Sequence, residues 1–259
     1  MSTPTTARGR PSPTAVPLFG AALAAGLSLA IAGGCGSVAS RGMNAEGVRL
    51  FDQTRYEEAA RQFEQAVYED PNDSDGYYNL AATYHRLGTL KQRPSDLNQA
   101  EHYYHMCLDR DPNHQECYRG LAVLMAERGQ PEEAFALLKG WADRNPASPE
   151  PKIELARLYE EFGDKKTAKD YLVHALAIDS GNSRALAALG KLREETGEPA
   201  QALADYERSL RGDQYQAGVR QRVAALRSRL NPAISTSPTT PTPAGGTRVV
   251  TGTTDSTRR

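Results

Sequence analysis

The stretch "YEEAARQFEQAVYEDPND" at residues 56–73 has the polar and apolar spacing of an amphipathic helix that ends at a proline. Its apolar side carries Ala59 and Ala66, where the core stripe of an ordinary helix carries leucine. The stretch "PEEAFALLKGWADRNP" at residues 131–146 has the same order, with Ala134, a leucine one turn later and a closing proline. Small side chains let two helices approach closely, so their recurrence predicts tightly paired helices.

The same arrangement recurs five times along the chain, at a spacing of 34 residues except for one interval of 41. The central small residue of each block is Ala59, Ala100, Ala134, Ala168 or Ala202. One turn later the blocks have Phe63, Tyr104, Leu138, Leu172 and Tyr206. A second small residue lies upstream in each block, at Gly47, Ala81, Ala122, Ala156 and Gly190. A fixed period of this length predicts a solenoid, in which each repeat buries its apolar face against its neighbours.

This pattern resembles the tetratricopeptide repeat over about 175 residues. The resemblance implies an all-α fold, a right-handed superhelical solenoid of five helix pairs, A then B, plus a C-terminal capping helix. Glycines agree with the expected helix ends, because Gly129, Gly163 and Gly197 follow the A helices and suit a left-handed C-terminal position. Gly88 is expected at the same place in the second repeat.

The expected repeats run over residues 40–73, 74–114, 115–148, 149–182 and 183–216, with the capping helix at 217–230. Seven extra residues in the second repeat fall in "TLKQRPSD", and we expect them to form a protruding loop between its A and B helices. The segment 231–259 is rich in Thr, Pro, Ser and Gly. It carries too few large apolar residues to offset the entropy of the chain, so we expect it to be disordered.

Residues 1–34 have the features of a signal peptide, since two arginines precede the apolar run at 18–32. The sequence "IAGGCGS" resembles a bacterial lipobox, although alanine stands where that family usually has leucine. The resemblance implies a lipid such as palmitate on Cys35, a short tether at 35–39 and a location on the extracytoplasmic side of a bacterial cell envelope. If the cell has two membranes, the outer one is favoured. The alternative is ordinary cleavage after "SVAS", which leaves Cys35 without a role.

Composition and motifs exclude several classes of function. The formal net charge of −1 provides no basic field for nucleic acid. The sequence contains no G-x-S-x-G, no Walker-type phosphate loop, no H-E-x-x-H and no C-x-x-C. We therefore expect no enzyme activity, no cofactor and no metal. His102 and His105 are expected to face solvent, as residues of a B helix.

Cys107 and Cys117 lie at equal distances from Pro112, on the two sides of a predicted turn. In an oxidising compartment they could form a disulfide if their Cα atoms lie within about 7 Å. The alternative is two buried thiols.

In the tetratricopeptide family, partners bind along A-helix residues that do not pack within their own repeat. Carried over by position, the groove residues are Asn44, Val48, Phe51, Tyr78, His85, Arg119, Val123, Glu127, Arg157, Glu160, Lys191 and Glu194. The first half of this set is aromatic and apolar, and the second half carries charges of both signs. This composition suits an extended peptide or a helix, although the same residues could simply keep a solenoid soluble.

Some family members grip a C-terminal carboxylate with lysines, asparagines and an arginine on three successive A helices. Asn44 and Asn79 fall at or beside such positions, but Glu116 and Gly120 stand where a lysine and an arginine are needed. We therefore expect no clamp of that kind.

The combined expectation is a membrane-anchored scaffold that captures a protein partner during bacterial envelope assembly. One alternative is an accessory or substrate-binding module of an envelope enzyme, with a glycan or peptide as ligand. A second is a cytosolic co-chaperone, if the signal sequence is spurious.

Overall fold

The computed structural model describes residues 32–231, with side chains from residue 38 onward. The predictions of a signal peptide at 1–34 and of a disordered tail at 231–259 therefore fall almost entirely outside the described residues. Between residues 32 and 231 all regular structure is α-helical, which confirms the expected fold class. The chain forms two compact units, divided between Pro112 and Asn113. We call them the first and the second unit.

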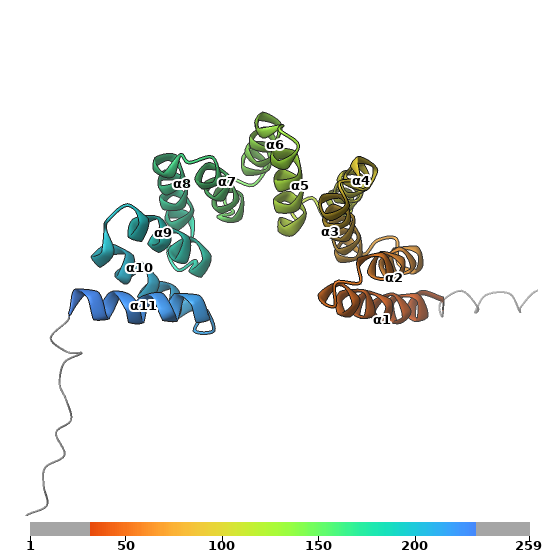
Figure 1. The fold of residues 1–259 in the computed structure, drawn as a ribbon, viewed down its shortest axis with the longest axis horizontal. Helices are drawn as coiled ribbons and strands as arrows, with labels where there is room; N and C mark the ends of the chain where they lie inside the picture. The colour runs from red at the N-terminus through yellow and green to blue at the C-terminus, as the bar shows by residue number, and fades with distance from the viewer. Residues whose placement is uncertain (1–31, 232–259) are drawn as a thin grey trace, which may run out of the picture. The chain divides into compact units, whose positions relative to one another are not determined.

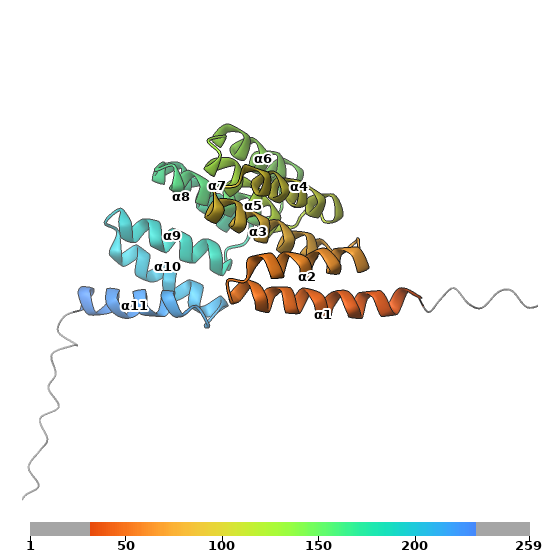
Figure 2. The ribbon, with the colours of Figure 1, turned by 45° about the vertical axis from the view of Figure 1, so that its right-hand side comes forward.

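The first unit contains four helices (Figure 1). They are α1 (Ala32–Asp52), α2 (Tyr56–Glu69), α3 (Ser74–Lys91) and α4 (Pro94–Arg110). Helix α1 lies along α2, as Figure 2 shows, and α3 pairs with α4. Helix α2 also packs against α3, so the two A–B pairs share one core. Phe63 and Leu80 are buried there beside Leu50.

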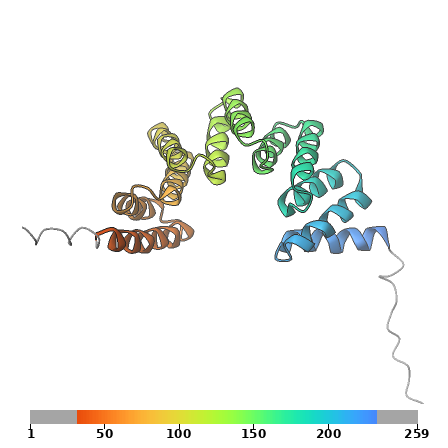
Figure 3. The same cartoon turned by 180° about the vertical axis from the view of Figure 1, so that it is seen from behind.

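The second unit contains seven helices (Figure 3). They are α5 (Gln115–Glu127), α6 (Pro131–Arg144), α7 (Glu150–Glu161), α8 (Lys165–Ile178), α9 (Ser183–Glu195), α10 (Pro199–Gly212) and α11 (Ala217–Leu230). Each helix packs against the next, which makes three A–B pairs followed by α11. Helix α11 covers α10 through Val223 and Leu226, which meet Tyr206. It thus takes the place of the expected capping helix.

The small residues lie where helices touch. All five central alanines are fully buried, and the large residue one turn later is at most 2% exposed in every repeat. A Cβ atom on Gly47 would lie 2.5 Å from the ring of Phe63, and one on Gly190 would lie 2.8 Å from the ring of Tyr206. These glycines therefore allow an aromatic ring to lie directly against the A-helix backbone.

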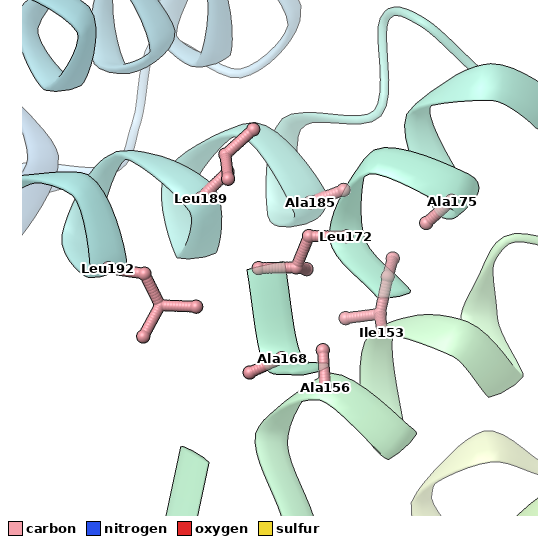
Figure 4. Packing of buried hydrophobic residues seen from close by; sticks show 8 residues of the cluster. All are labelled: Ile153, Ala156, Ala168, Leu172, Ala175, Ala185, Leu189 and Leu192. Carbon is pink, nitrogen blue, oxygen red and sulfur yellow. The ribbon is translucent and has the colours of Figure 1, made fainter. Parts of the chain in front are cut away.

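Figure 4 shows this packing in the second unit, where Ala156 and Ala168 lie at the contact between α7 and α8. Leu172 on α8 belongs to the same cluster as Leu189 and Leu192 on α9. One cluster thus extends over three successive helices, as expected when each repeat completes the core of the next.

Three of the four glycines expected at the ends of A helices are confirmed there. Gly129, Gly163 and Gly197 have φ of 76°, 83° and 82°, a left-handed conformation that glycine adopts without a Cβ clash. The expectation for Gly88 is wrong, because this residue lies inside α3. A Cβ atom there would lie 2.5 Å from the side chain of Leu97 on α4, so Gly88 allows close helix packing instead.

The prediction of a protruding loop in the second repeat is also wrong. The inserted residues lengthen both helices, so that α3 has 18 residues and α4 has 17, whereas α5 and α6 have 13 and 14. Only Gln92 and Arg93 connect α3 to α4. Seven residues make about two turns of helix, so roughly one added turn in each partner keeps the pair in register. The added turns remain paired at Gly88 and Leu97.

The N-terminal boundary also differs from the expectation. Helix α1 begins at Ala32, so residues 35–39 continue the helix and do not form a separate tether. The segment contains no proline that would stop a helix. Cys35 therefore lies within the first turns of α1. Within residues 32–231, no helix combines the length and the apolar character that crossing a membrane requires.

The close A–B contact predicts a strong response to added volume. We expect Ala168→Leu to lower the free energy of unfolding by about 1–3 kcal/mol, because the added side chain overpacks the α7–α8 contact. Ala177→Leu, at an exposed position of the same helix, should change it by less than about 0.5 kcal/mol. Urea unfolding followed by circular dichroism measures both. Equal stability of the two variants would contradict the packing argument.

Candidate functional site

The first unit places part of the predicted groove set on the neighbouring A helices α1 and α3. Asn44 on α1 and Asn79 on α3 form a direct amide pair, in which Asn79 Nδ2 donates to Asn44 Oδ1 at 2.9 Å. Val48, one turn after Asn44, is 42% exposed. The two helices thus present adjoining amide and apolar groups on one surface.

Two further predicted groove residues, Tyr78 and His85, pack against the buried ring of Tyr104. The rings of Tyr78 and His85 lie 6.4 and 6.2 Å from the ring of Tyr104, which is 2% exposed. His85 Nδ1 also lies 3.4 Å from the Tyr104 hydroxyl. Tyr78 and His85 remain half-buried, so part of each ring faces solvent from a fixed position.

Phe51 has a different environment. Its ring meets the ring of Tyr56 edge-on at 5.0 Å, and its side chain packs against the core cluster that contains Leu50 and Phe63. Phe51 therefore contributes to the stability of the first unit. A substitution at Phe51 cannot separate partner binding from folding, whereas Val48 and Tyr78 are better probes of this surface.

In the second unit, the predicted groove residues Arg119 and Arg157 converge on Glu154, which is not one of the predicted groove residues. Glu154 on α7 is fully buried, with no exposed surface. Arg119 on α5 approaches it at 2.6 Å, Arg157 at 3.2 Å, and Arg184 on α9 at 2.7 Å. The amide of Gln115 donates a further hydrogen bond at 3.2 Å. One carboxylate thus joins three successive A helices.

The arginines decide the ionisation state of Glu154. Burial alone would raise the pKa of this carboxyl group, since it disfavours the charged form. Hydrogen bonds and charge attraction from Arg119 and Arg184 outweigh burial and lower the pKa from 4.5 to about 2. Glu154 is therefore ionised at neutral pH, and the cluster is an ionic network around one buried carboxylate.

A pocket of about 420 Å³ opens beside this network. Arg119, Arg157 and Arg184 line its polar side. Ile153 and Leu172 line its apolar side. We call this the arginine pocket. Its lining can hold an anionic group that is attached to an apolar stem.

Three further charged groove residues, Glu160, Lys191 and Glu194, are engaged in local pairs. Lys191 on α9 contacts Glu160 on α7 at 2.5 Å. Glu194 accepts hydrogen bonds from the Tyr206 hydroxyl at 3.1 Å and from Arg222 on α11 at 2.9 Å. These pairs tie successive helices to one another, so their charges serve the fold as well as the surface.

The last two predicted groove residues lie on α5 in the same unit. Val123 is half-buried there, and Glu127 is exposed at the last helical position.

Both cysteines considered for a disulfide are fully buried, Cys107 on α4 and Cys117 on α5. The structure records each of them as disulfide-bonded. Cys107 belongs to the first unit and Cys117 to the second, and the two units are not placed relative to one another. The pairing of the two cysteines with each other therefore stays a prediction. His102 and His105 are exposed on α4.

Comparison with known families identifies the repeats. A family described as "Tetratricopeptide repeat" matches residues 94–149 and 125–192, and one described as "TPR repeat" matches residues 47–88. Together the matches cover more than half of the chain.

Two curated relatives match shorter segments. The chain is 32% identical over 84 residues to human Tetratricopeptide repeat protein 8, and 36% identical over 67 residues to Hsp70-Hsp90 organizing protein 1 of Glycine max. The alignments take in 32% and 26% of this chain, but 16% and 10% of those proteins. The chain therefore spans less than a fifth of the length of these curated relatives.

Two solved structures share the fold. A thermophilic TPR protein of Thermus thermophilus is 26% identical, with a TM-score of 0.54, and the match covers 73% of this chain and 98% of that one. A tetratricopeptide repeat protein from Parabacteroides merdae has the same TM-score at 15% identity, covering 71% of this chain and 69% of that one.

The lowered pKa of Glu154 predicts a pH-dependent contribution to stability. Since the pKa is lower in the folded chain than in the unfolded one, ionised Glu154 stabilises the fold above about pH 4.5 and loses this effect as the pH falls toward 2. We expect Glu154→Gln to lower the free energy of unfolding by about 3 kcal/mol at pH 7. The difference from the parent should shrink steadily between pH 5 and pH 2.

Chemical denaturation across this pH range measures the effect. Glu161→Gln is the matched control, because Glu161 also contacts Arg157, at 3.3 Å, but is exposed. It should change stability by less than about 0.5 kcal/mol at every pH. A constant difference between Glu154→Gln and the parent would contradict the ionic role of Glu154.

Proposed function

Because the chain belongs to the tetratricopeptide repeat family, we propose that it is a membrane-anchored scaffold that binds a segment of a partner polypeptide on its A-helix surfaces. The family fold is that of a protein-interaction scaffold. The observation that carries the proposal is the surface of the first unit formed by Asn44, Val48 and Tyr78. It displays the apolar side chain of Val48, the ring of Tyr78 against buried Tyr104, and the paired amides of Asn44 and Asn79.

Fixed aromatic and apolar side chains are suited to recognition. Tyr78 rests on the buried ring of Tyr104, so little side-chain freedom remains to be lost when a partner binds. Aromatic residues tend to dominate the energy of protein interfaces, whereas scattered surface charges contribute little. The Asn44–Asn79 pair adds amide groups able to hydrogen-bond the backbone of an extended peptide.

Membrane attachment through Cys35 rests on the lipobox resemblance and on the position of Cys35 in α1. Ser40 is buried in the first unit, about 8 Å along the helix from Cys35 at 1.5 Å per residue. A lipid on Cys35 would therefore keep the first unit beside the membrane, where its A-helix surface would meet an envelope partner. We propose a role in bacterial envelope assembly on this basis.

The two alternatives predict different outcomes of simple experiments. A cytosolic co-chaperone would remain in the cytosolic fraction and carry no lipid. A glycan-binding module would retain glycan fragments but no crosslinked protein. No contact within residues 32–231 favours either alternative over a protein-binding scaffold.

The anchor is tested by Cys35→Ser. We expect this variant to lose metabolic labelling with palmitate and to leave the membrane fraction, because the lipobox contains no second thiol to which a lipid can be attached. The double variant Cys107→Ser with Cys117→Ser keeps Cys35 and should keep the label. Labelling of the Cys35→Ser protein would overturn the anchor.

The binding surface is tested by Val48→Ser combined with Tyr78→Ala. We expect at least a tenfold loss of partner recovery after crosslinking in envelope preparations, corresponding to about 1.4 kcal/mol or more. Tyr68→Ala is the matched control, because Tyr68 is 81% exposed on the B helix α2 and lies off the A-helix surface.

Circular dichroism must first show unchanged helical content for both proteins. Recovery by the double variant at the level of the Tyr68→Ala control would contradict the assignment of this surface.

A further inference from the structure

The arginine pocket contains more donors than its own carboxylate can use. The two oxygens of Glu154 accept five N–H groups, two from Arg119 and one each from Gln115, Arg157 and Arg184. This carboxylate is therefore saturated. Arg157 Nη2 is buried and has no hydrogen-bond partner. A buried guanidinium nitrogen without a partner costs free energy, so an acceptor oxygen that reaches Arg157 Nη2 would gain a hydrogen bond there.

The charges around the pocket point to the same conclusion. The charged side chains that line the pocket are three basic ones, Arg119, Arg157 and Arg184, and two acidic ones, Glu154 and Glu160. The lining thus has one more positive group than negative ones, and one further carboxylate would balance it. This surplus is local, because the whole chain has a net charge of −1.

We propose that the arginine pocket binds the side-chain carboxylate of an acidic segment of the partner polypeptide. This deepens the proposed function and rests on it, since the pocket lies on the A-helix surface of the second unit. Glu154 itself shows how a carboxylate on a methylene stem fits among these guanidinium groups. A glutamate of the partner would place its carboxylate on Arg157 and Arg184 and its methylene groups on Ile153 and Leu172.

Arginine suits this role better than lysine. The planar guanidinium offers donors in pairs and can hold two carboxylates on different edges. Arg184 gives one nitrogen to Glu154, and its side chain is 44% exposed, so its other edge is accessible from the pocket. Screening by salt weakens such contacts, so binding should fall with ionic strength.

The experiment is fluorescence anisotropy on the full chain with short peptides that carry a neutral fluorophore, at about 50 mM salt. The probe is hexaglutamate with both ends blocked. Blocked hexaglutamine tests whether charge is needed, and hexaglutamine with a free C-terminus tests a terminal carboxylate. We expect hexaglutamate to bind, blocked hexaglutamine not to bind, and the free terminus to bind at least tenfold more weakly than hexaglutamate.

Variants locate the site. Arg157→Gln and Arg184→Gln should each weaken hexaglutamate binding at least fivefold, and Arg184→Lys should restore only part of the loss at Arg184. Glu154→Gln should strengthen binding at least threefold in the folded protein, because it removes a competing carboxylate and keeps a similar shape. Arg211→Gln, at an exposed arginine outside the pocket, should stay within twofold of the parent. Circular dichroism checks that each variant is folded.

Several results would overturn the proposal. They are no binding of hexaglutamate by the parent, equal losses for Arg184→Gln and Arg211→Gln, weaker binding by folded Glu154→Gln, or preference for the free terminus. Partner recovery that still depends on Val48 and Tyr78 would then leave the proposed function standing. Conversely, hexaglutamate binding with no effect of those two residues on recovery would refute the first-unit surface alone.

Discussion

The close contact between the A and B helices of each repeat is the constraint on which the rest of the structure depends. It exists because alanine or glycine occupies the crossing points, where any larger side chain would separate the helices. At Gly47 and Gly190, an aromatic ring lies against the A helix in the space that a Cβ atom would occupy. The stabilisation then comes from the large residue of the partner helix, which is buried completely by this approach.

This constraint also determines which residues remain for other tasks. Once the small residues of an A helix face its B helix, other positions on the A helix face away from that contact. In the first unit these positions hold Val48, Tyr78 and the Asn44–Asn79 pair. In the second unit they hold arginines and glutamates that pair across α5, α7 and α9. Each unit thus has an A-helix surface of its own chemical character.

The sequence was sufficient to predict the all-α fold, the five helix pairs and the left-handed glycines, because these depend on spacing within one repeat. It did not predict the site of Glu154. Within its own repeat Glu154 appears as one more polar residue, and its partners Arg119 and Arg184 lie in the repeats before and after it. The available signal was an inward-facing glutamate with one arginine in the repeat before it and another in the repeat after it. The spacing of residues within a single repeat does not show this relation between repeats.

The errors about the second repeat and about the start of α1 have one cause. The spacing of residues in the sequence does not show whether extra residues continue a helix or form a loop. The seven inserted residues near Gly88 were predicted to protrude, but about two turns of added length fit two helices equally well when their packing continues. Helix length was similarly underestimated at the N-terminus, where α1 includes Cys35. The added turns of α3 and α4 remain paired at Gly88 and Leu97, so this pair gains buried contact, whereas an exposed loop gains none. In a repeat array, a helix-compatible insertion between A and B is therefore better interpreted first as longer helices and only then as a loop.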